Sequence, residues 1–273
     1  MKAASFDYVR PRDVAEALTA LSAANGGAKL LAGGQSLGPM LNLRLARPSL
    51  LVDVSRLQAL RQVENRGAAW RIGAGVTHAH LEDAHLPGGE MLRDVAAGIA
   101  YRSVRSRGTI GGSLAHADPA ADWPVALAAL GASVNLRTAK GTRSMVVDRF
   151  VQDAFTTALA HDEIIETIDV PKLSPGARYG YYKFCRKTGE FAEASAAAVF
   201  DRDKGIARIF IGAVRGSPQP LADLARRVAE QGQVVSREAI AAAIAQEIGE
   251  LDPIERRMAA GVVARALQQV FRP

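Results

Sequence analysis

The chain has 273 residues, of which 48% are apolar and 23% charged, with a formal charge of +6 and an isoelectric point near 9.7. This length allows one large domain or two modest domains with a real core, and the composition is that of an ordinary globular protein. The arginines are scattered and aromatic residues are few, so no basic stripe with stacking rings indicates nucleic-acid binding.

Cysteine content and hydropathy indicate the cellular compartment that we expect for the protein. Cys185 is the single cysteine, which excludes an internal disulfide and an iron–sulfur cluster held by this chain alone. Its place in a strand-like run favours a buried structural thiol over a nucleophile. The N-terminus has no apolar signal core and no run of eighteen apolar residues occurs, so we expect a cytoplasmic chain without direct membrane insertion.

The first part of the chain predicts a β-α-β unit. Residues 6–9 form a short strand, and a helix follows with Asp13 as its N-cap. Residues 29–32 form the strand that leads into Gly33-Gly34-Gln35-Ser36, and a short helical turn after Pro39 and then residues 50–54 complete a small first subdomain. Glycine lets the backbone approach a ligand closely and backbone N–H groups donate to anions, so this first glycine segment suits a phosphate.

The stretch Gly73-Ala74-Gly75 resembles a dinucleotide-binding turn, because it follows a predicted strand and precedes a helix capped by Thr77. We interpret it as a structural turn, since His78 replaces the third glycine and no parallel βαβ series surrounds it. His78 and His80 could together bind a metal, but on a helix they point to different faces, which favours two surface histidines.

A second glycine segment, residues 108–122, contains Gly111-Gly112 between the hydroxyls of Thr109 and Ser113, before an apolar helix at residues 120–130. Both segments are apolar runs that break into Gly-Gly, a hydroxyl residue and leucine. With glycine N–H groups as donors in each, two such loops could hold the two ends of one long anionic ligand. Neither loop is a P-loop or a Gly-x-Gly-x-x-Gly motif, so a nucleotide would be bound outside a Rossmann fold.

Charged groups near the second segment allow two interpretations each. Arg102, Arg105 and Arg107 either screen phosphate charge or are merely solvated. Asp118 and Asp122 form an i, i+4 pair whose structural role would be to cap a helix start, and a metal role lacks a third ligand.

The remaining chain predicts a hairpin at residues 133–147, a half-buried strand at residues 164–170 and a linker at residues 172–176. Three strands and then three helices follow. The predicted strands are residues 179–187, 194–200 and 206–214, and the predicted helices are residues 221–230, 237–248 and 253–270.

The two glycine segments together resemble the two FAD signatures of the medium subunit of molybdenum hydroxylases, the carbon monoxide dehydrogenase and xanthine dehydrogenase family. The similarity covers essentially the whole chain, including Arg44-Leu45-Ala46-Arg47-Pro48 and Tyr182-Lys183-Phe184. It implies an α+β fold with a vanillyl-alcohol-oxidase (PCMH-type) FAD-binding domain at residues 1–175, in subdomains of about 1–55 and 56–175. It also implies a C-terminal domain at residues 177–273, an antiparallel sheet with a helical bundle.

The resemblance also implies which residues hold FAD. The first segment would wrap the diphosphate, the second the diphosphate and the ribityl region, and Asp122 and Lys183 would make polar contacts. Gln35 stands where carbon monoxide oxidisers often have histidine, which favours another substrate. The implied contacts are Leu30, Leu31, Ala32, Gly33, Gly34, Gln35, Ser36, Leu37, Ile99, Thr109, Ile110, Gly111, Gly112, Ser113, Asp118, Asp122, Ile165 and Lys183.

The implied function is electron transfer. The partners would be a large molybdenum-cofactor subunit, which oxidises an N-heteroaromatic compound, purine, aldehyde or carbon monoxide, and a small [2Fe-2S] subunit, in a dimer of heterotrimers. FAD on this chain would take electrons from the clusters and pass them to an external acceptor. The sequence shows no nucleophile–base pair or metal set that would contradict this. A standalone FAD-dependent oxidase or reductase of the same fold and a nonenzymatic nucleotide-binding regulator stay open as alternatives.

Overall fold

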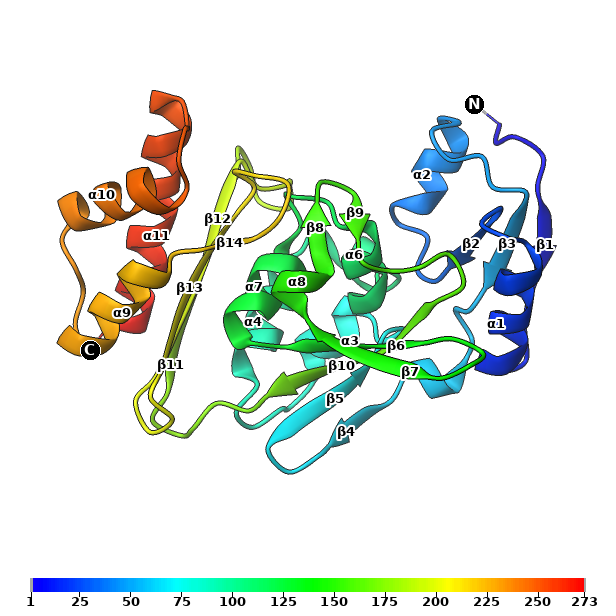
Figure 1. Cartoon of the computed structure of the whole chain (residues 1–273), viewed down its shortest axis with the longest axis horizontal. Coiled ribbons are helices and arrows are strands. Elements are labelled where there is room, and N and C mark those ends of the chain that lie inside the picture. Colours follow the sequence, from blue (N-terminus) through cyan, green and yellow to red (C-terminus); the bar gives the residue numbers. More distant parts are fainter. Residues whose placement is uncertain (1, 273) are drawn as a thin grey trace.

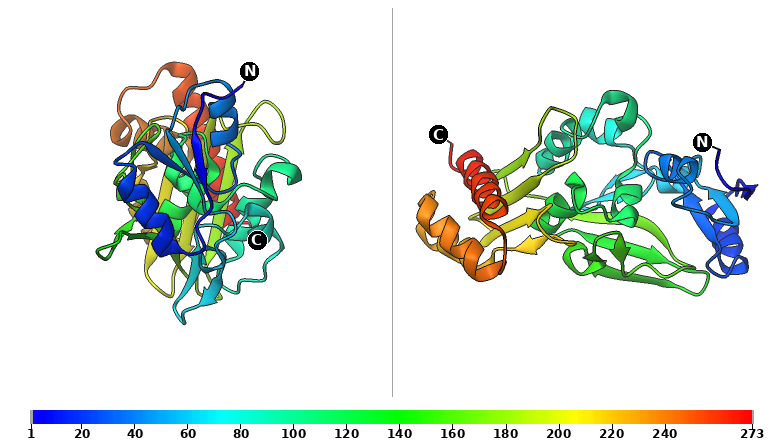
Figure 2. Two further views of the ribbon diagram at one scale, coloured as in Figure 1. Left: turned by 90° about the vertical axis from the view of Figure 1, so that its right-hand side faces the viewer. Right: turned by 90° about the horizontal axis from the view of Figure 1, so that it is seen from above.

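Three larger sheets follow one another along the long axis of the molecule in the computed structural model, which describes residues 2–272. A three-stranded sheet near the N-terminus is followed by a five-stranded sheet in the middle and a four-stranded sheet with helices beyond it (Figure 1). The right-hand view of Figure 2 shows the same order from above, with the first strands and the last helix at opposite ends.

The N-terminal sheet is parallel, with strand order β1-β3-β2. Its helix α1 begins as the sequence predicts, because the Asp13 side chain accepts a hydrogen bond from the Glu16 backbone N–H at 2.8 Å. Helix α2 begins directly after the first glycine segment, earlier than the helical turn expected after Pro39. The elements are β1 (Asp7–Val9), α1 (Val14–Ala23), β2 (Ala28–Leu31), α2 (Leu37–Asn42) and β3 (Leu50–Asp53).

The middle sheet is antiparallel, with strand order β4-β5-β10-β6-β7. Its strands are β4 (Val63–Asn65), β5 (Ala69–Gly73), β6 (Ser133–Arg137), β7 (Thr142–Val146) and β10 (Ile164–Pro171). The other elements of this part are η1 (Gln58–Leu60), α3 (His78–Asp83), α4 (Glu90–Ala97), α5 (Arg102–Arg105), α6 (Ile110–His116), α7 (Asp122–Leu130), α8 (Val147–Phe150) and the hairpin β8 (Val151–Asp153) and β9 (Thr156–Thr157). Between β5 and α3 lies the Gly73–Gly75 turn, where an added Cβ on Gly73 would lie 2.3 Å from the Leu60 carbonyl oxygen and where Ala74 and Gly75 line a cavity.

Helix α7 joins the middle of the molecule to the C-terminal sheet. All nine of its residues are buried. It packs against β12 (Ala194–Asp201) and β13 (Ile206–Gly212) on one side and against the middle core on the other. A helix that is apolar on all sides must be surrounded on all sides to leave water. The two parts of the chain therefore share one continuous core through α7.

The C-terminal sheet is antiparallel, with strand order β11-β12-β13-β14. Of its three helices, the first and the last pack on the face opposite α7, and the middle one packs on these two helices (Figure 1). Strand β12 is buried throughout, and alternate residues enter different cores: Ala196 and Ala198 face the helices, whereas Ala197 and Val199 face the middle core. The elements are β11 (Arg178–Phe184), β12 (Ala194–Asp201), β13 (Ile206–Gly212), β14 (Gln219–Pro220), α9 (Ala222–Gln231), α10 (Arg237–Glu247) and α11 (Pro253–Val270).

The start of α7 and the burial of Cys185 also differ from the sequence expectations. Helix α7 starts at Asp122 instead of residue 120, because Asp118 Oδ1 accepts the Ala120 N–H at 2.9 Å and holds a turn there. Cys185 lies just beyond β11 and is half-buried, so the expected core thiol is wrong. Across residues 2–272 we find no helix with the length and apolar character needed to span a membrane.

Candidate functional site

The two glycine segments meet in space. A Cβ atom added to Gly33 would lie 2.0 Å from the Arg107 carbonyl oxygen and 2.9 Å from the Gly108 Cα, so only glycine allows this approach. Gly34 has a φ of +71°, a conformation that side chains with a Cβ rarely adopt. Residues about seventy positions apart in the chain therefore form one wall.

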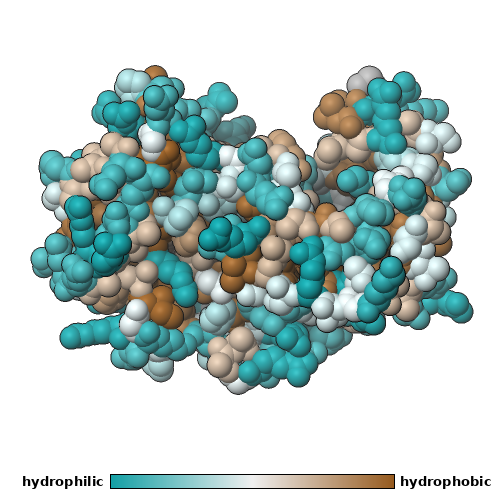
Figure 3. All heavy atoms as spheres, in the orientation of Figure 1, coloured by the Kyte–Doolittle hydropathy of each residue, from teal (hydrophilic) through white to brown (hydrophobic). Residues whose placement is uncertain are grey.

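This wall borders a cavity of about 690 Å³ between the N-terminal sheet and the middle of the molecule. In Figure 3 the surface is hollowed at its upper edge between the right-hand lobe and the centre. Of the eighteen residues predicted to hold the cofactor, all but Leu31 and Ile110 line the cavity. Ile110 lies in the hydrophobic core, and the Leu31 side chain lies against Gly34.

The first segment presents free backbone donors. Within the described chain, none of the five consecutive N–H groups from Gly33 to Leu37 has a hydrogen-bond acceptor, although all five residues line the cavity. Unpaired backbone N–H groups are costly unless water or a ligand satisfies them. Five in a row at a cavity wall form a site for an anion with several oxygen atoms.

The second segment differs from its prediction as a donor loop. Gly111 and Gly112 lie in the first turn of α6, and their N–H groups donate to the Ala74 carbonyl (2.9 Å) and the Thr109 hydroxyl (3.1 Å). Ser113 N–H donates to the Thr109 carbonyl at 3.0 Å. This segment therefore contributes glycine surface and hydroxyl groups, and the expectation that its glycine N–H groups bind an anion is wrong.

An ion pair closes the C-terminal side of the cavity. Lys183 Nζ lies 2.9 Å from Asp122 Oδ1, and both side chains are nearly buried. The Tyr181 hydroxyl donates to the same carboxylate oxygen at 2.7 Å. Burial, reinforced by Asp122, raises the pKa of Tyr181 well above its usual value, which keeps the hydroxyl protonated as a donor. Strand β11 places Tyr181 and Lys183 on one face, so both reach the first residue of α7.

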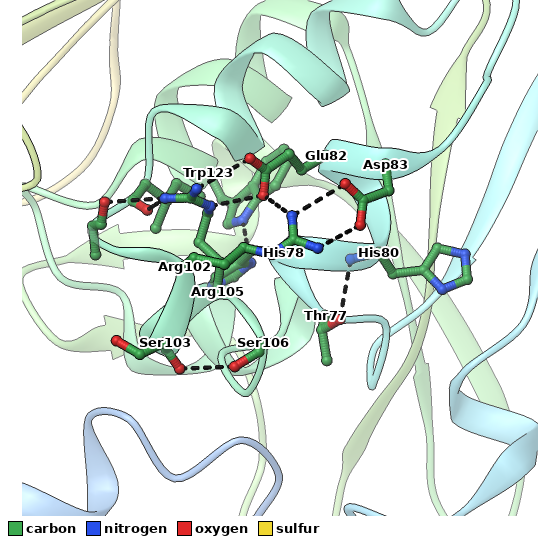
Figure 4. A network of polar contacts seen from close by, with 12 residues as sticks. Thr77, His78, His80, Glu82, Asp83, Arg102, Ser103, Arg105, Ser106 and Trp123 are labelled. Atoms are coloured by element: carbon green, nitrogen blue, oxygen red, sulfur yellow. Dashed lines mark hydrogen bonds and ion pairs between the residues drawn. The ribbon is translucent and has the colours of Figure 1, made fainter.

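Two of the three predicted arginines, Arg102 and Arg105, are held in ion pairs, whereas Arg107 is exposed, as the solvated alternative expects. Arg105 Nε donates to Glu82 at 2.8 Å, and Arg102 bridges Glu82 and Asp83 at 2.5 Å each (Figure 4). Arg105 also donates to the carbonyls of Ile99 (2.9 Å) and Ala100 (3.1 Å), both at the cavity wall. Of the three, Arg107 alone contributes its carbonyl to the contact with Gly33.

His78 is also placed differently from its prediction. It is only 6% exposed, whereas His80 is exposed as expected. The Trp123 Nε1–H donates to His78 Nδ1 at 3.0 Å, as Figure 4 shows. The sequence does not reveal the burial of His78, because its partner Trp123 lies 45 residues away, on α7.

Some cavity residues escaped sequence reasoning. Phe155 has a φ of +55° and is 61% exposed, and its ring lies 5.1 Å from that of His116. Phe191, in the turn between β11 and β12, is 68% exposed at the cavity as well. Each is an isolated aromatic residue in a polar turn, and the sequence alone does not indicate that such a residue will lie at a cavity.

Comparison with known proteins identifies the family. Residues 4–173 match the family model described as FAD binding domain in molybdopterin dehydrogenase. The chain belongs to the FAD-binding medium subunits of the molybdenum hydroxylases. It is 40% identical over 209 residues to the 6-hydroxypseudooxynicotine dehydrogenase complex subunit alpha of Paenarthrobacter nicotinovorans, covering 75% of this chain and 70% of that one.

A further relative and a solved structure extend the similarity to the full length of the chain. The carbon monoxide dehydrogenase medium chain of Hydrogenophaga pseudoflava is 34% identical over 281 residues, which cover 97% of both chains. A solved structure of carbon monoxide dehydrogenase from the same organism superposes with a TM-score of 0.90 at 33% identity and 99% coverage of both chains. This FAD-binding subunit is thus an oxidoreductase component with the fold of its family.

Proposed function

We propose that this chain is the electron-transfer subunit of a heterotrimeric molybdenum hydroxylase. Its FAD would receive electrons from [2Fe-2S] clusters on a small subunit and release them to an external acceptor, while a large molybdenum subunit oxidises the substrate. FAD supplies chemistry that accepts electrons singly and releases them as a pair. A dimer of such heterotrimers in the cytoplasm is part of the proposal.

The observation that carries the proposal is the run of five unpaired N–H groups at Gly33–Leu37 beside a cavity of about 690 Å³. The diphosphate of FAD has the oxygen acceptors that these donors require. Gly33 leaves no room for a Cβ, so the segment is shaped for close backbone approach. The donor set and the cavity therefore fit an extended dinucleotide.

The remaining side chains have assigned roles in the proposal. Asp122 and Lys183 offer a carboxylate and an ammonium group to polar atoms of the cofactor, and Tyr181 holds that carboxylate in place. Ile99 and Ile165 offer apolar surface at the same wall. We propose the vanillyl-alcohol-oxidase type for residues 1–175, with the division near residue 176, because the family match ends at residue 173.

The substrate class is proposed only as a small oxidisable molecule bound on the large subunit. The relatives are named for a nicotine derivative and for carbon monoxide, two unlike substrates. Since similar medium chains serve both, the residues of this chain do not select the substrate. Gln35 in the first segment favours a substrate other than carbon monoxide only as a mark of which relatives the chain resembles, not as a substrate contact.

The test is to purify the chain together with the proteins that accompany it and to record visible spectra and metal content. We expect releasable flavin on this chain, and molybdenum and iron only in the larger complex. Flavin on the isolated chain that turns over with an organic substrate would contradict the proposal and support a standalone oxidase. Absence of flavin from both the chain and the complex would support the nucleotide-binding regulator.

A further inference from the structure

His78 connects α3 to the second glycine segment. Its backbone N–H donates to the Gly108 carbonyl at 2.9 Å, and the preceding Thr77 forms an antiparallel bridge with Thr109. The residue is 6% exposed, and its ring lies beside Trp123 (Figure 4). The ring also lies against Gly108, and both residues line the cavity. A buried polar ring at a ligand cavity needs partners for both of its nitrogen atoms.

The hydrogen bond from Trp123 determines the tautomer of this ring. Indole Nε1–H can only donate, so His78 Nδ1 must accept and carry no proton. Burial, and to a lesser degree the positive charge of Arg105, lowers the pKa of His78 to about 4. The ring is therefore neutral at physiological pH and carries its proton on Nε2.

This Nε2–H group has no acceptor among residues 2–272. It is not enclosed, since the only fully buried side-chain nitrogen or oxygen without a partner in that range is Ser195 Oγ. The Cδ2–Nε2 edge lies against Gly108, where an added Cβ would come within 2.8 Å of both atoms. Gly108 and His78 both line the cavity, so the donor is at the surface that a ligand would contact.

We propose that His78 is a ligand-binding residue whose Nε2–H donates a hydrogen bond to an oxygen atom of the dinucleotide in the cavity. Trp123 orients the ring, and Gly108 leaves space for its donor edge. The inference rests on the proposed FAD site and adds to it an uncharged side-chain donor, outside both glycine segments, whose strength does not change between pH 6 and 9.

Two substitutions distinguish the roles of the two ring nitrogen atoms of His78. His78→Asn keeps an acceptor for Trp123 near the Nδ1 position but removes the distal donor, whereas His78→Gln offers an amide N–H near the Nε2 position and loses the acceptor. The full-length chain, freed of flavin, is titrated with FAD and followed by flavin fluorescence. We expect His78→Asn to raise the FAD dissociation constant about tenfold and His78→Gln to change it less than about threefold.

A purely structural role predicts the reverse order, because only His78→Gln leaves Trp123 without an acceptor. As a second measurement, the imidazole N–H proton and Nε2 of His78 in ¹⁵N-histidine-labelled chain should shift when FAD is added. Unchanged FAD affinity in His78→Asn together with unshifted His78 signals would overturn the role of His78 but not the proposed FAD site. A wild-type chain that binds no FAD, free or in its complex, would overturn the proposed function as well.

Discussion

Individual side chains at the cavity owe their state to partners far along the chain. Asp122 is paired with Lys183 and accepts from Tyr181, 59 residues away, and His78 is oriented by Trp123. In each case burial makes the polar partner necessary, since an unpaired buried group costs more than a hydrogen bond gains. The cavity is therefore lined by groups whose orientation is fixed before a ligand arrives.

Tyr181 and Tyr179 form a natural matched pair on β11. Each hydroxyl donates to a carboxylate at 2.7 Å, Tyr181 to Asp122 at the cavity and Tyr179 to Asp94 away from it. We expect either change to phenylalanine to lower the free energy of unfolding by about 1–2 kcal/mol. Only Tyr181→Phe should also weaken FAD binding, by about fivefold to tenfold. Equal FAD affinity in the two variants would show that Asp122 needs no positioning.

The His78 ring predicts a pH dependence of stability. Its pKa is about 4 in the fold, against about 6.5 when unfolded, so the unfolded chain binds more protons between these values. The contribution of His78 to the free energy of unfolding is therefore fully present above pH 6.5 and is lost as the pH falls towards 4. Relative to His78→Asn, the wild type should lose about 2 kcal/mol more between pH 7.5 and pH 5 in urea unfolding. Parallel curves for the two proteins would contradict a neutral buried ring.

At the scale of elements, the two glycine segments look alike in sequence but act differently. The first follows β2 and leaves its N–H groups unpaired, whereas the second starts α6 and uses its N–H groups internally. The difference arises because Thr109 caps α6 and Ala74 of the β5–α3 turn accepts from Gly111. The local sequence of the second segment does not show that the Ala74 carbonyl will lie beside the Gly111 N–H group.

Two glycines in and beside the first segment test its close packing. Gly33→Ala places a Cβ 2.0 Å from the Arg107 carbonyl oxygen, whereas Gly38→Ala, inside α2, meets nothing within 4 Å. We expect Gly33→Ala to lower the free energy of unfolding by about 2–3 kcal/mol and to abolish measurable FAD binding. Gly38→Ala should raise stability by about 0.5–1 kcal/mol. Denaturant unfolding and FAD titration check both, and FAD binding retained by a folded Gly33→Ala chain would contradict the assignment.

At the scale of the whole molecule, α7 and the Asp122–Lys183 ion pair make the C-terminal sheet part of the cavity-bearing body. Helix α7 is buried on all sides only because β12 and β13 cover it, and Lys183 reaches the cavity only because β11 pairs in that sheet. The two predicted domains are therefore expected to depend on one another, even if the division near residue 176 is correct.

A fragment of residues 1–175 tests this dependence. It would expose the apolar side of α7 that packs on the C-terminal sheet, and it would lack Tyr181 and Lys183. We expect it to aggregate or to bind a hydrophobic dye, and to melt well below the full chain. Thermal unfolding with light scattering, using the full chain as the control, provides the measurement. A monomeric fragment with the same Tm and FAD affinity would show that the N-terminal part is autonomous.

The sequence by itself determined the order of most elements, the helix caps and the two glycine segments, because caps, turns and apolar periodicity are encoded in neighbouring residues. It also carried the family resemblance, which the comparisons confirm. Only the tertiary structure decided that the second glycine pair starts a helix, that His78 is buried against Trp123, and that Lys183 pairs with Asp122. These outcomes depend on contacts between residues 37 to 61 positions apart, and such contacts exist only once the sheets and α7 have packed together.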